Sequence, residues 1–245
     1  MQDYTEDYLL DKQVKIFQPV DGYRASTDAV MVSSLVKSVN NGDKILDVGS
    51  GTGAISLCLA SRFQQKKPQI IGLDLQAKLV ELSNLSAQAN GFDEFLSYYN
   101  CDIREKLNFI KANYFNHVIT NPPYTDHDMP SPNISKAFAH NHNNFNLTEW
   151  ISFCLKMLQP YGMFYMINRA EAIDGILYSL YGKAGNIKVI PLFTKAQDKA
   201  KRVMVIAQKT SKTPTEILPQ FIVHAEEGYT TKAHNILREG KGYFD

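Results

Sequence analysis

The sequence predicts a doubly wound α/β fold: a seven-stranded sheet, mostly parallel, whose last two strands are antiparallel. Short apolar segments alternate with segments of helical periodicity along most of the 245 residues, which is typical of a parallel sheet with helices on both faces. Two late apolar segments, 187–193 and 202–208, are joined by residues 194–201. Because this connection is too short for a crossover helix, we expect these two strands to run antiparallel.

The individual elements follow from the apolar periodicity and from the turn residues between them. Residues 1–26 are predicted to form an N-terminal extension with turns, and a helix is predicted over 26–39, with Thr27 or Asp28 as its N-cap. Short apolar runs predict further strands at 44–49, 69–75, 95–103, 115–121, 162–168 and 220–224. Helical spacing predicts helices within 51–63, 76–90, 147–158, 170–181 and 230–238.

The composition is that of an ordinary globular protein. Hydrophobic residues make up 44% and charged residues 21% of the chain, and the formal net charge is +1. No segment has the composition of a linker, so we expect one domain over 1–245 with a short N-terminal extension, 1–43. Cys58, Cys101 and Cys154 are widely spaced in apolar contexts, which predicts buried thiols rather than disulfides or metal ligands.

The location of the protein is predicted from what the sequence lacks. No apolar run is long enough to span a bilayer, and the first residues, MQDYTEDYLLDKQVK, are acidic and polar. We therefore expect a cytoplasmic protein without membrane contact, without a metal ion, and monomeric.

A glycine-rich segment separates the strand at 44–49 from the helix that follows it. Gly49, Gly51 and Gly53 occupy alternate positions, where they allow a tight turn and let a ligand approach the backbone at a helix N-terminus. Asp47 stands at the entrance of this loop and would repel a pyrophosphate, whereas Asp74, at the end of the next strand, is placed to accept the two hydroxyls of a ribose. These five residues favour a cationic ligand with a ribose over a phosphorylated one.

The loop and the second acid resemble the class I S-adenosylmethionine-dependent methyltransferases, whose fold is Rossmann-like. The resemblance implies that Asp47 and the three glycines hold the methionine part of S-adenosylmethionine and that Asp74 holds its ribose. Asp102 follows the third strand, where this family usually places a side chain on the adenine amino group. Each acid could instead be a helix N-cap or part of a turn at a strand end.

The segment VITNPPYTDHD, residues 118–128, ends the fourth strand in an amide, two prolines and an aromatic ring. The prolines fix the backbone, so that the side-chain carbonyl of Asn121 and the main-chain carbonyl of Pro122 can accept both hydrogens of one NH₂ group. Tyr124 offers a flat face on which a planar group can stack. Such acceptors stabilise the positive charge that grows on a conjugated amine during methyl transfer, without a strong general base.

The Asn-Pro-Pro-Tyr segment resembles the signature of amino-methyltransferases that act on adenine, cytosine, guanine or a glutamine amide. The glutamine enzymes usually carry a helical domain before the glycine loop, and only 46 residues precede Asp47 here. From Gly22 onward, through segments 22–36 and 221–240, the chain looks like the bacterial tRNA adenine-N6 methyltransferases that modify position 37 of a valine tRNA. Methylation of a protein glutamine or an rRNA guanine, or a cofactor-binding module without turnover, stay open as alternatives.

The resemblance also suggests residues that contact the substrate. Asn121 is assigned to the cofactor site as well as to catalysis, together with Pro122 and Tyr124. Tyr23, Asp28 and Pro123 are candidates for shaping the cofactor mouth and the base pocket.

The charged segment 183–202 is rich in lysine, and within it we expect Lys199, Lys201 and Arg202 to contact tRNA phosphates, unless this is only a solvated loop. The residues that follow the catalytic tetrapeptide, up to 146, are rich in histidine and asparagine. We expect an RNA-contacting loop there, not a metal site, because thiols and carboxylates at ligand spacing are lacking. Relatives often have a charged pair where this chain has His140 and Asn141, so the exact tRNA target is left open.

Overall fold

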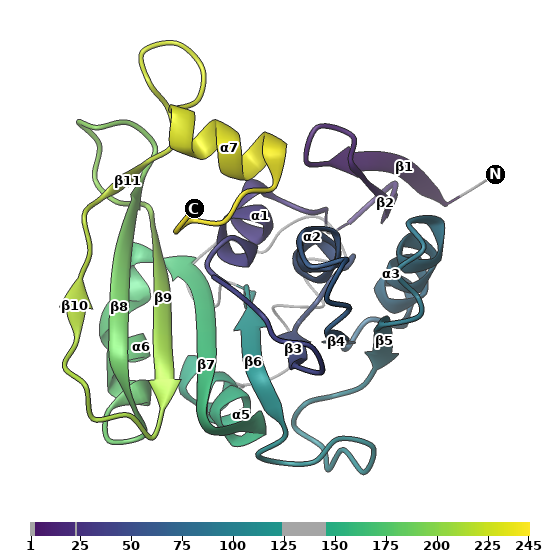
Figure 1. The fold of residues 1–245 in the computed structure, drawn as a ribbon, viewed down its shortest axis with the longest axis horizontal. Coiled ribbons are helices and arrows are strands. Elements are labelled where there is room, and N and C mark those ends of the chain that lie inside the picture. The colour runs from purple at the N-terminus through teal and green to yellow at the C-terminus, as the bar shows by residue number, and fades with distance from the viewer. Residues whose placement is uncertain (1–2, 23, 124–145) are drawn as a thin grey trace.

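The computed structural model describes residues 3–22, 24–123 and 146–245. Its main sheet is formed by β3 (Lys44–Val48), β4 (Gln69–Asp74), β5 (Leu96–Asn100), β6 (Phe115–Thr120), β7 (Leu158–Arg169), β8 (Ala184–Phe193), β9 (Arg202–Lys209), β10 (Glu216–Ile217) and β11 (Phe221–Ile222). The order across the sheet is β10-β8-β9-β7-β6-β3-β4-β5, and β11 also pairs with β8 (Figure 1).

The strand directions confirm the predicted mixed sheet. Strands β5, β4, β3, β6 and β7 pair in parallel. Strand β9 lies antiparallel between β7 and β8, so the predicted antiparallel pair is confirmed. Among the described residues the sheet has nine strands, not the seven predicted, because β10 and β11 add to the far side of β8. Strand β11 lies within the short strand predicted over 220–224, whereas β10 was not predicted, since its two residues are too few to show a period of two.

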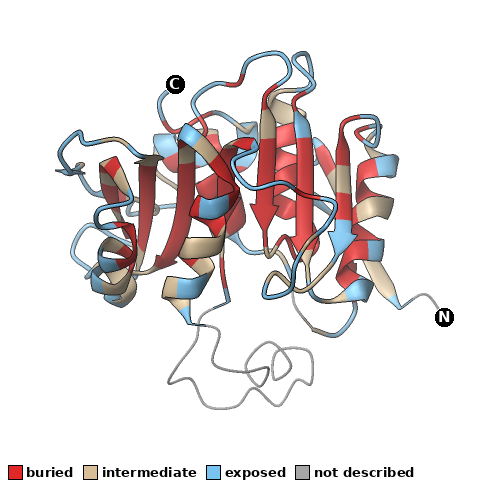
Figure 2. Ribbon diagram, turned by 90° about the horizontal axis from the view of Figure 1, so that it is seen from below, coloured by how far each residue is buried: buried red, intermediate tan, exposed pale blue. Residues whose placement is uncertain are grey.

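Helices cover both faces of the sheet. One face carries α1 (Thr27–Ser33), α2 (Ala54–Arg62), α3 (Ala77–Ala89) and α7 (Thr231–Glu239), and the other carries α5 (Leu147–Met157) and α6 (Ile173–Leu180), which follows the short 3-10 helix η1 (Ala170–Ala172) (Figure 1). Two clusters of buried apolar side chains fill the two layers, and the strands between them are mostly buried (Figure 2). The strands are therefore held in place by helices packed on both faces of the sheet.

Helix α1 ends at Ser33, although the sequence predicted a helix over 26–39. The hydroxyls of Ser33 and Ser34 donate to the carbonyls of Val30 and Met31, at 2.7 and 2.6 Å. Serine hydroxyls that bond to backbone carbonyls compete with regular helix hydrogen bonds. The chain then continues through buried apolar residues to β3 without regular structure.

The N-terminal extension is a β-hairpin, which the sequence did not predict. Strand β1 (Tyr4–Leu9) pairs antiparallel with β2 (Val14–Pro19), and β2 is tied to α3 by a hydrogen bond from the Phe17 backbone N–H to Ser86 Oγ. The turn between the strands uses left-handed backbone at Leu10, Asp11 and Lys12. The usual Asn-Gly or Asp-Gly signal of a hairpin is absent from such a turn.

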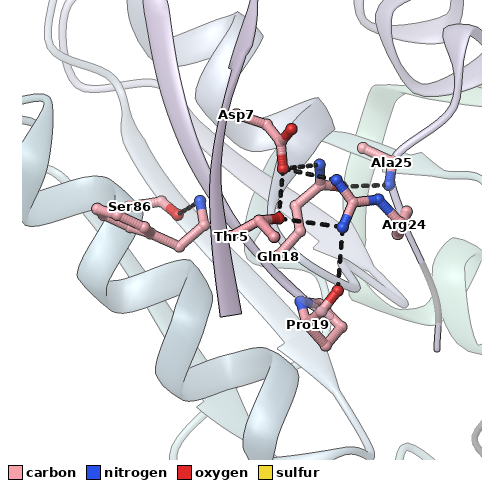
Figure 3. Close-up of polar contacts among 8 residues, drawn as sticks. Thr5, Asp7, Gln18, Pro19, Arg24, Ala25 and Ser86 are labelled. Atoms are coloured by element: carbon pink, nitrogen blue, oxygen red, sulfur yellow. Dashed lines mark hydrogen bonds and ion pairs between the residues drawn. The ribbon is translucent and has the colours of Figure 1, made fainter. Parts of the chain in front are cut away.

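A polar network joins this hairpin to the chain that leads into α1 (Figure 3). The Arg24 guanidinium donates to Asp7 Oδ2 at 2.6 Å and to the Pro19 carbonyl at 3.1 Å. Gln18 donates to the same Asp7 oxygen and accepts from the Ala25 N–H at 2.7 Å. These bonds fix residues 24–25, two positions before the helix that carries Asp28.

Candidate active site

The glycine loop lies where β3 ends and α2 begins. Gly49, Gly51 and Gly53 have φ angles of +72°, +55° and +86°, and Gly53 is the residue that precedes α2. Residues with a side chain are strained in this left-handed region, so the glycines are needed for the path of the backbone. The predicted turn between strand and helix is present, with the helix N-terminus behind it.

Asp47 is fully buried near the end of β3. Its Oδ2 accepts a 2.6 Å hydrogen bond from Ser56 Oγ on α2, whereas its Oδ1 has no hydrogen-bond partner among the described residues. Burial raises the pKa of Asp47 to about 7, helped by the charge of Asp74 and opposed by the bonds from Ser56. A cation brought close to this carboxyl group would therefore be stabilised by it.

Asp74 ends β4 and contacts the glycine loop directly. Its Oδ2 accepts from the backbone N–H of Gly51 at 2.8 Å, and its Oδ1 accepts from the backbone N–H of Gln76 at 2.9 Å. Burial raises the pKa of Asp74, against the effect of these backbone hydrogen bonds. Each carboxylate oxygen can accept a further hydrogen bond, so the group can hold the loop and a ligand hydroxyl together.

Asp102 lies two residues beyond β5 and interacts with Arg104. The Arg104 Nε–H is 2.8 Å from each carboxylate oxygen, and the Arg104 backbone N–H donates to Oδ1 at 2.9 Å. This is the turn at a strand end that the sequence left open as an alternative. A role toward an adenine ring stays a prediction.

Asn121, Pro122 and Pro123 follow β6 at the same edge of the sheet. The last residue of β6, Thr120, is paired in register with Val48 of β3, so Asn121 and Gly49 leave two neighbouring strands side by side. Pro122 is buried and Pro123 is exposed. Tyr23, Tyr124 and the histidine-rich loop lie outside the described residues, so their predicted roles stay predictions.

Two aromatic residues that the sequence did not single out contact the glycine loop. Tyr98 of β5 donates from its hydroxyl to the Gly53 carbonyl at 3.2 Å, and its ring fills the space beside Gly72. Trp150 of α5 lies against Gly49, where a Cβ atom would come within 2.9 Å of two indole carbons. No local signal marks such contacts, because both aromatics belong to elements distant in the sequence.

The basic residues predicted to contact the substrate are separated by the fold. Arg202, the first residue of β9, pairs with Arg169, the last residue of β7, so the 194–201 loop lies at the same carboxyl edge as Asn121. Lys199 and Lys201 in this loop are exposed. Lys183 precedes β8 and therefore lies at the opposite edge, so the segment 183–202 is not one basic patch.

Asp28 and Arg202 form an ion pair. The Arg202 Nε is 2.9 Å from Asp28 Oδ2, so this arginine connects the start of α1 to the start of β9. The contact with a tRNA phosphate predicted for Arg202 would compete with its ion pair to Asp28.

The described part of the chain has none of the residue clusters typical of a metal site. It contains no group of three or more His, Cys, Asp and Glu residues placed to hold a metal ion. Cys58 and Cys154 are buried free thiols, as predicted, whereas Cys101 is half-buried. No helix in the described ranges is long and apolar enough to cross a membrane. A cavity of about 390 Å³ lies between the hairpin turn, the start of α1 and α7, away from the glycine loop.

Comparison with known proteins identifies the family. Residues 25–149, slightly more than half of the 245 residues, match the methyltransferase small domain family. The chain belongs to this family. The matched segment of the methyltransferase runs from the residue after Arg24 to the first turn of α5, and includes the glycine loop, Asp74 and the Asn121 segment.

Several curated relatives of the methyltransferase carry the name tRNA1(Val) (adenine(37)-N6)-methyltransferase. The protein of Dyadobacter fermentans is 23% identical over 223 residues, which are 89% of this chain and 90% of the relative. The protein of Tolumonas auensis is 25% identical over 89% of this chain and 94% of its own. That of Pedobacter heparinus is 30% identical over 64% of each chain.

Solved structures share the fold of the methyltransferase. A predicted O-methyltransferase from Agrobacterium tumefaciens has a TM-score of 0.72 at 19% identity, covering 88% of this chain and 97% of its own. An S-adenosylmethionine-dependent O-methyltransferase from Thermotoga maritima has a TM-score of 0.55 at 16% identity, covering 78% and 68%. These likenesses confirm the predicted Rossmann-like α/β fold.

Proposed function

We propose that the protein transfers a methyl group from S-adenosylmethionine to the exocyclic N6 amine of an adenosine in tRNA, namely position 37 in the anticodon loop of a valine tRNA. The observation that carries this proposal is the adjacency of the glycine loop and Asn121. They leave neighbouring strands, β3 and β6, at one edge of the sheet. Ligands of doubly wound folds bind at this carboxyl edge.

The residues around the loop fit the methyl donor. Three buried polar atoms of the loop region, Asp47 Oδ1, Ser50 Oγ and Thr52 Oγ1, have no hydrogen-bond partner among the described residues. Buried polar groups without partners are rare in native proteins, so these three atoms call for a partner that a bound ligand or water would supply. Asp47 and the glycine backbone would hold the methionine part, and Asp74 the ribose hydroxyls. Bound S-adenosylmethionine supplies an electrophilic methyl group on a sulfonium.

Asn121 and Pro122 supply the chemistry on the acceptor side. The amide oxygen of Asn121 and the Pro122 carbonyl accept hydrogen bonds from the N6 amine and orient its lone pair toward the methyl group. As the methyl group transfers, positive charge grows on this nitrogen and the same oxygens stabilise it. No residue has to remove a proton first, because the amine becomes acidic only once it is methylated.

Two observations support an RNA substrate. The relatives named as tRNA adenine-N6 methyltransferases match the chain over most of their length, 90% and 94% for two of them. The exposed Lys199 and Lys201 lie in a loop at the same edge as Asn121, where they can contact phosphates beside an extruded base. A tRNA substrate also agrees with the cytoplasmic location expected from the sequence.

The direct test is product analysis. The purified protein is incubated with methyl-labelled S-adenosylmethionine and unmodified bacterial tRNA, and the nucleosides are identified by mass spectrometry. We expect N6-methyladenosine at position 37 of a valine tRNA. Label in methylguanosine, or in protein glutamine when a cell extract is supplied, would support another planar amine as substrate. Cofactor binding without any label would indicate a binding module.

A variant of Asn121 separates catalysis from cofactor binding. Asn121→Ala should lower turnover by roughly a hundred- to a thousandfold, the loss seen when a charge-stabilising group is removed from an active site. Binding of S-adenosylhomocysteine, measured by calorimetry, should stay within a few fold of wild type. Equal losses in turnover and in cofactor affinity would contradict the placement of Asn121 on the acceptor side.

A further inference from the structure

Trp150 is the only tryptophan of the chain and lies in the first turn of α5. The start of this helix is fixed by a capping box, in which Asn146 and Glu149 each accept a backbone hydrogen bond from the other. The Trp150 indole N–H donates to Thr120 Oγ1 at 2.9 Å. Thr120 Oγ1 in turn donates to the Val48 carbonyl at 2.7 Å. A chain of two hydrogen bonds thus connects α5 to the ends of β6 and β3.

The same indole contacts the first glycine of the loop. A Cβ atom on Gly49 would lie 2.9 Å from both Cζ2 and Cη2 of Trp150, closer than real contacts allow. Gly49 therefore lacks a side chain for two reasons: its φ of +72° and the position of the indole. The ring fills the space that a side chain would need.

Trp150 approaches these two strand ends from the α5 face of the sheet. Val118 of β6 packs in the apolar cluster that contains the α5 residues, and Ile119 packs in the cluster on the other face. Because side chains alternate along a strand, Thr120 lies on the same face as Val118. The indole therefore contacts the turn at Gly49 from the α5 face of the sheet. It is also hydrogen-bonded to Thr120, the residue that precedes Asn121.

We propose that Trp150 is a positioning residue for methyl transfer. Its indole fixes the turn at Gly49 relative to Asn121, and thereby the methyl donor relative to the acceptor nitrogen. This inference rests on the proposed function, in which those two segments hold the two reactants. Reacting atoms must be held about 3–3.5 Å apart, and a displacement of about 1 Å can lower the rate a hundredfold.

A residue that aligns two half-sites should affect turnover more than either binding step. Trp150→Phe keeps an aromatic ring but removes the N–H that reaches Thr120. We expect kcat to fall about tenfold or more, with KM for tRNA and for S-adenosylmethionine changed less than about threefold. Thr120→Val removes the acceptor of the indole bond at nearly constant shape, together with the bond to the Val48 carbonyl, and should also lower kcat. Thr120→Ser keeps the hydroxyl, and this variant should retain most of the wild-type kcat.

The double variant tests whether the two residues act through one hydrogen bond. Trp150→Phe combined with Thr120→Val should lower kcat by clearly less than the product of the two single losses, because both changes remove the same bond. Multiplied losses in the double variant would overturn the proposal. Phe153→Leu is the matched control, since it changes an aromatic side chain of the same helix and leaves the indole bond in place. It should leave kcat near the wild-type value.

A fluorescence measurement tests the contact without RNA. Because the chain has one tryptophan, the emission of the wild-type protein reports on Trp150 alone. Titration with S-adenosylhomocysteine should shift or quench this emission, with the dissociation constant that calorimetry gives. Unchanged emission at saturation would overturn the proposal.

The outcomes separate this inference from the proposed function. If the wild-type protein methylates tRNA and Trp150→Phe does so at the same kcat, the inference is wrong and the function stands. If the wild-type protein methylates no tRNA, the function is wrong. The fluorescence titration then still decides whether Trp150 responds to the cofactor analogue, because it needs no RNA.

Discussion

The Asp74 carboxylate accepts a hydrogen bond from the backbone N–H of Gly51 at 2.8 Å, so the acid predicted to hold a ribose also holds the glycine loop. Asp74 closes β4 and Gly51 lies in the loop after the neighbouring strand β3. The loop is therefore held by the protein's own hydrogen bond. Such preorganisation reduces the cost of ordering the loop in the complex.

Loss of the Asp74 carboxylate should weaken cofactor binding. Asp74→Ala removes the bond to Gly51 as well as the acceptors for the ribose, and hydrogen bonds to a charged acceptor contribute roughly 1.5–3 kcal/mol each. We expect the affinity for S-adenosylhomocysteine to fall at least a hundredfold, measured by calorimetry. Asp93→Asn, an exposed acid after α3, is the control and should bind normally. An Asp74→Ala protein that binds as tightly as wild type would contradict the assignment.

The buried carboxyl of Asp47 should make stability depend on pH. Its pKa is about 7 in the folded protein and 3.8 as a reference, so the folded state keeps a proton that the unfolded chain loses. The cost of burying the charge is therefore absent below about pH 4, grows as the pH rises to about 7, and is constant above. At about 1.4 kcal/mol per pH unit the full cost reaches up to about 4 kcal/mol. Asp47→Asn should remove this decline, as urea unfolding at pH 5, 6, 7 and 8 would show.

The same proton should respond to the cofactor. A cationic ligand close to Asp47 stabilises the carboxylate and lowers its pKa, so binding near pH 6.5 should release a proton. Calorimetry of S-adenosylmethionine in two buffers of different ionisation enthalpy measures this release. The Asp47→Asn protein should release none. Equal release by both proteins would place the cation away from Asp47.

The fold was largely predictable, because apolar side chains repeat with different periods in strands and in helices. The hairpin β1–β2 was missed, since its turn at Leu10, Asp11 and Lys12 contains neither glycine nor asparagine. The strand ends also predicted which residues meet, because the carboxyl ends of parallel strands lie at one edge of the sheet, while the roles of these residues toward a ligand stay predictions. The contacts of Trp150 with Gly49 and of Tyr98 with Gly72 were not predictable, since they depend on packing between distant segments.

The contact between Tyr98 and Gly72 predicts a loss of stability in Gly72→Ala. A Cβ atom there would lie 2.2 Å from the Tyr98 ring, and Gly72 does not have a left-handed φ, so the substitution tests packing alone. Overpacking of this kind costs roughly 1–3 kcal/mol in free energy of unfolding, measured in urea. Gly175→Ala in α6 is the matched control, because its nearest atom is 4.0 Å away. It should stabilise the protein slightly, since alanine favours helix. Equal effects of the two substitutions would contradict this packing.

The position of the 194–201 loop predicts which lysines bind tRNA. Lys199 and Lys201 lie at the edge of Asn121, whereas Lys183 lies at the other end of β8, which has 10 residues. At about 3.3 Å per residue the two ends of this strand are about 30 Å apart. Lys199→Glu with Lys201→Glu should raise KM for tRNA at least tenfold and leave cofactor affinity unchanged. Lys183→Glu should change neither.

The dependence on salt distinguishes phosphate contacts from other effects of these charges. Each phosphate contact contributes about 0.7 to the slope of log affinity against log salt concentration on a single strand. Neutralising two contacts with Lys199→Ala and Lys201→Ala should therefore reduce the slope by about 1.4. Filter binding of tRNA at several salt concentrations measures it. Arg202 is left unchanged in these variants, because it forms an ion pair with Asp28 at the start of α1. Loss of that pair could change folding as well as RNA binding, and the two effects would not be separable. An unchanged slope would mean that the RNA approaches the site from another side.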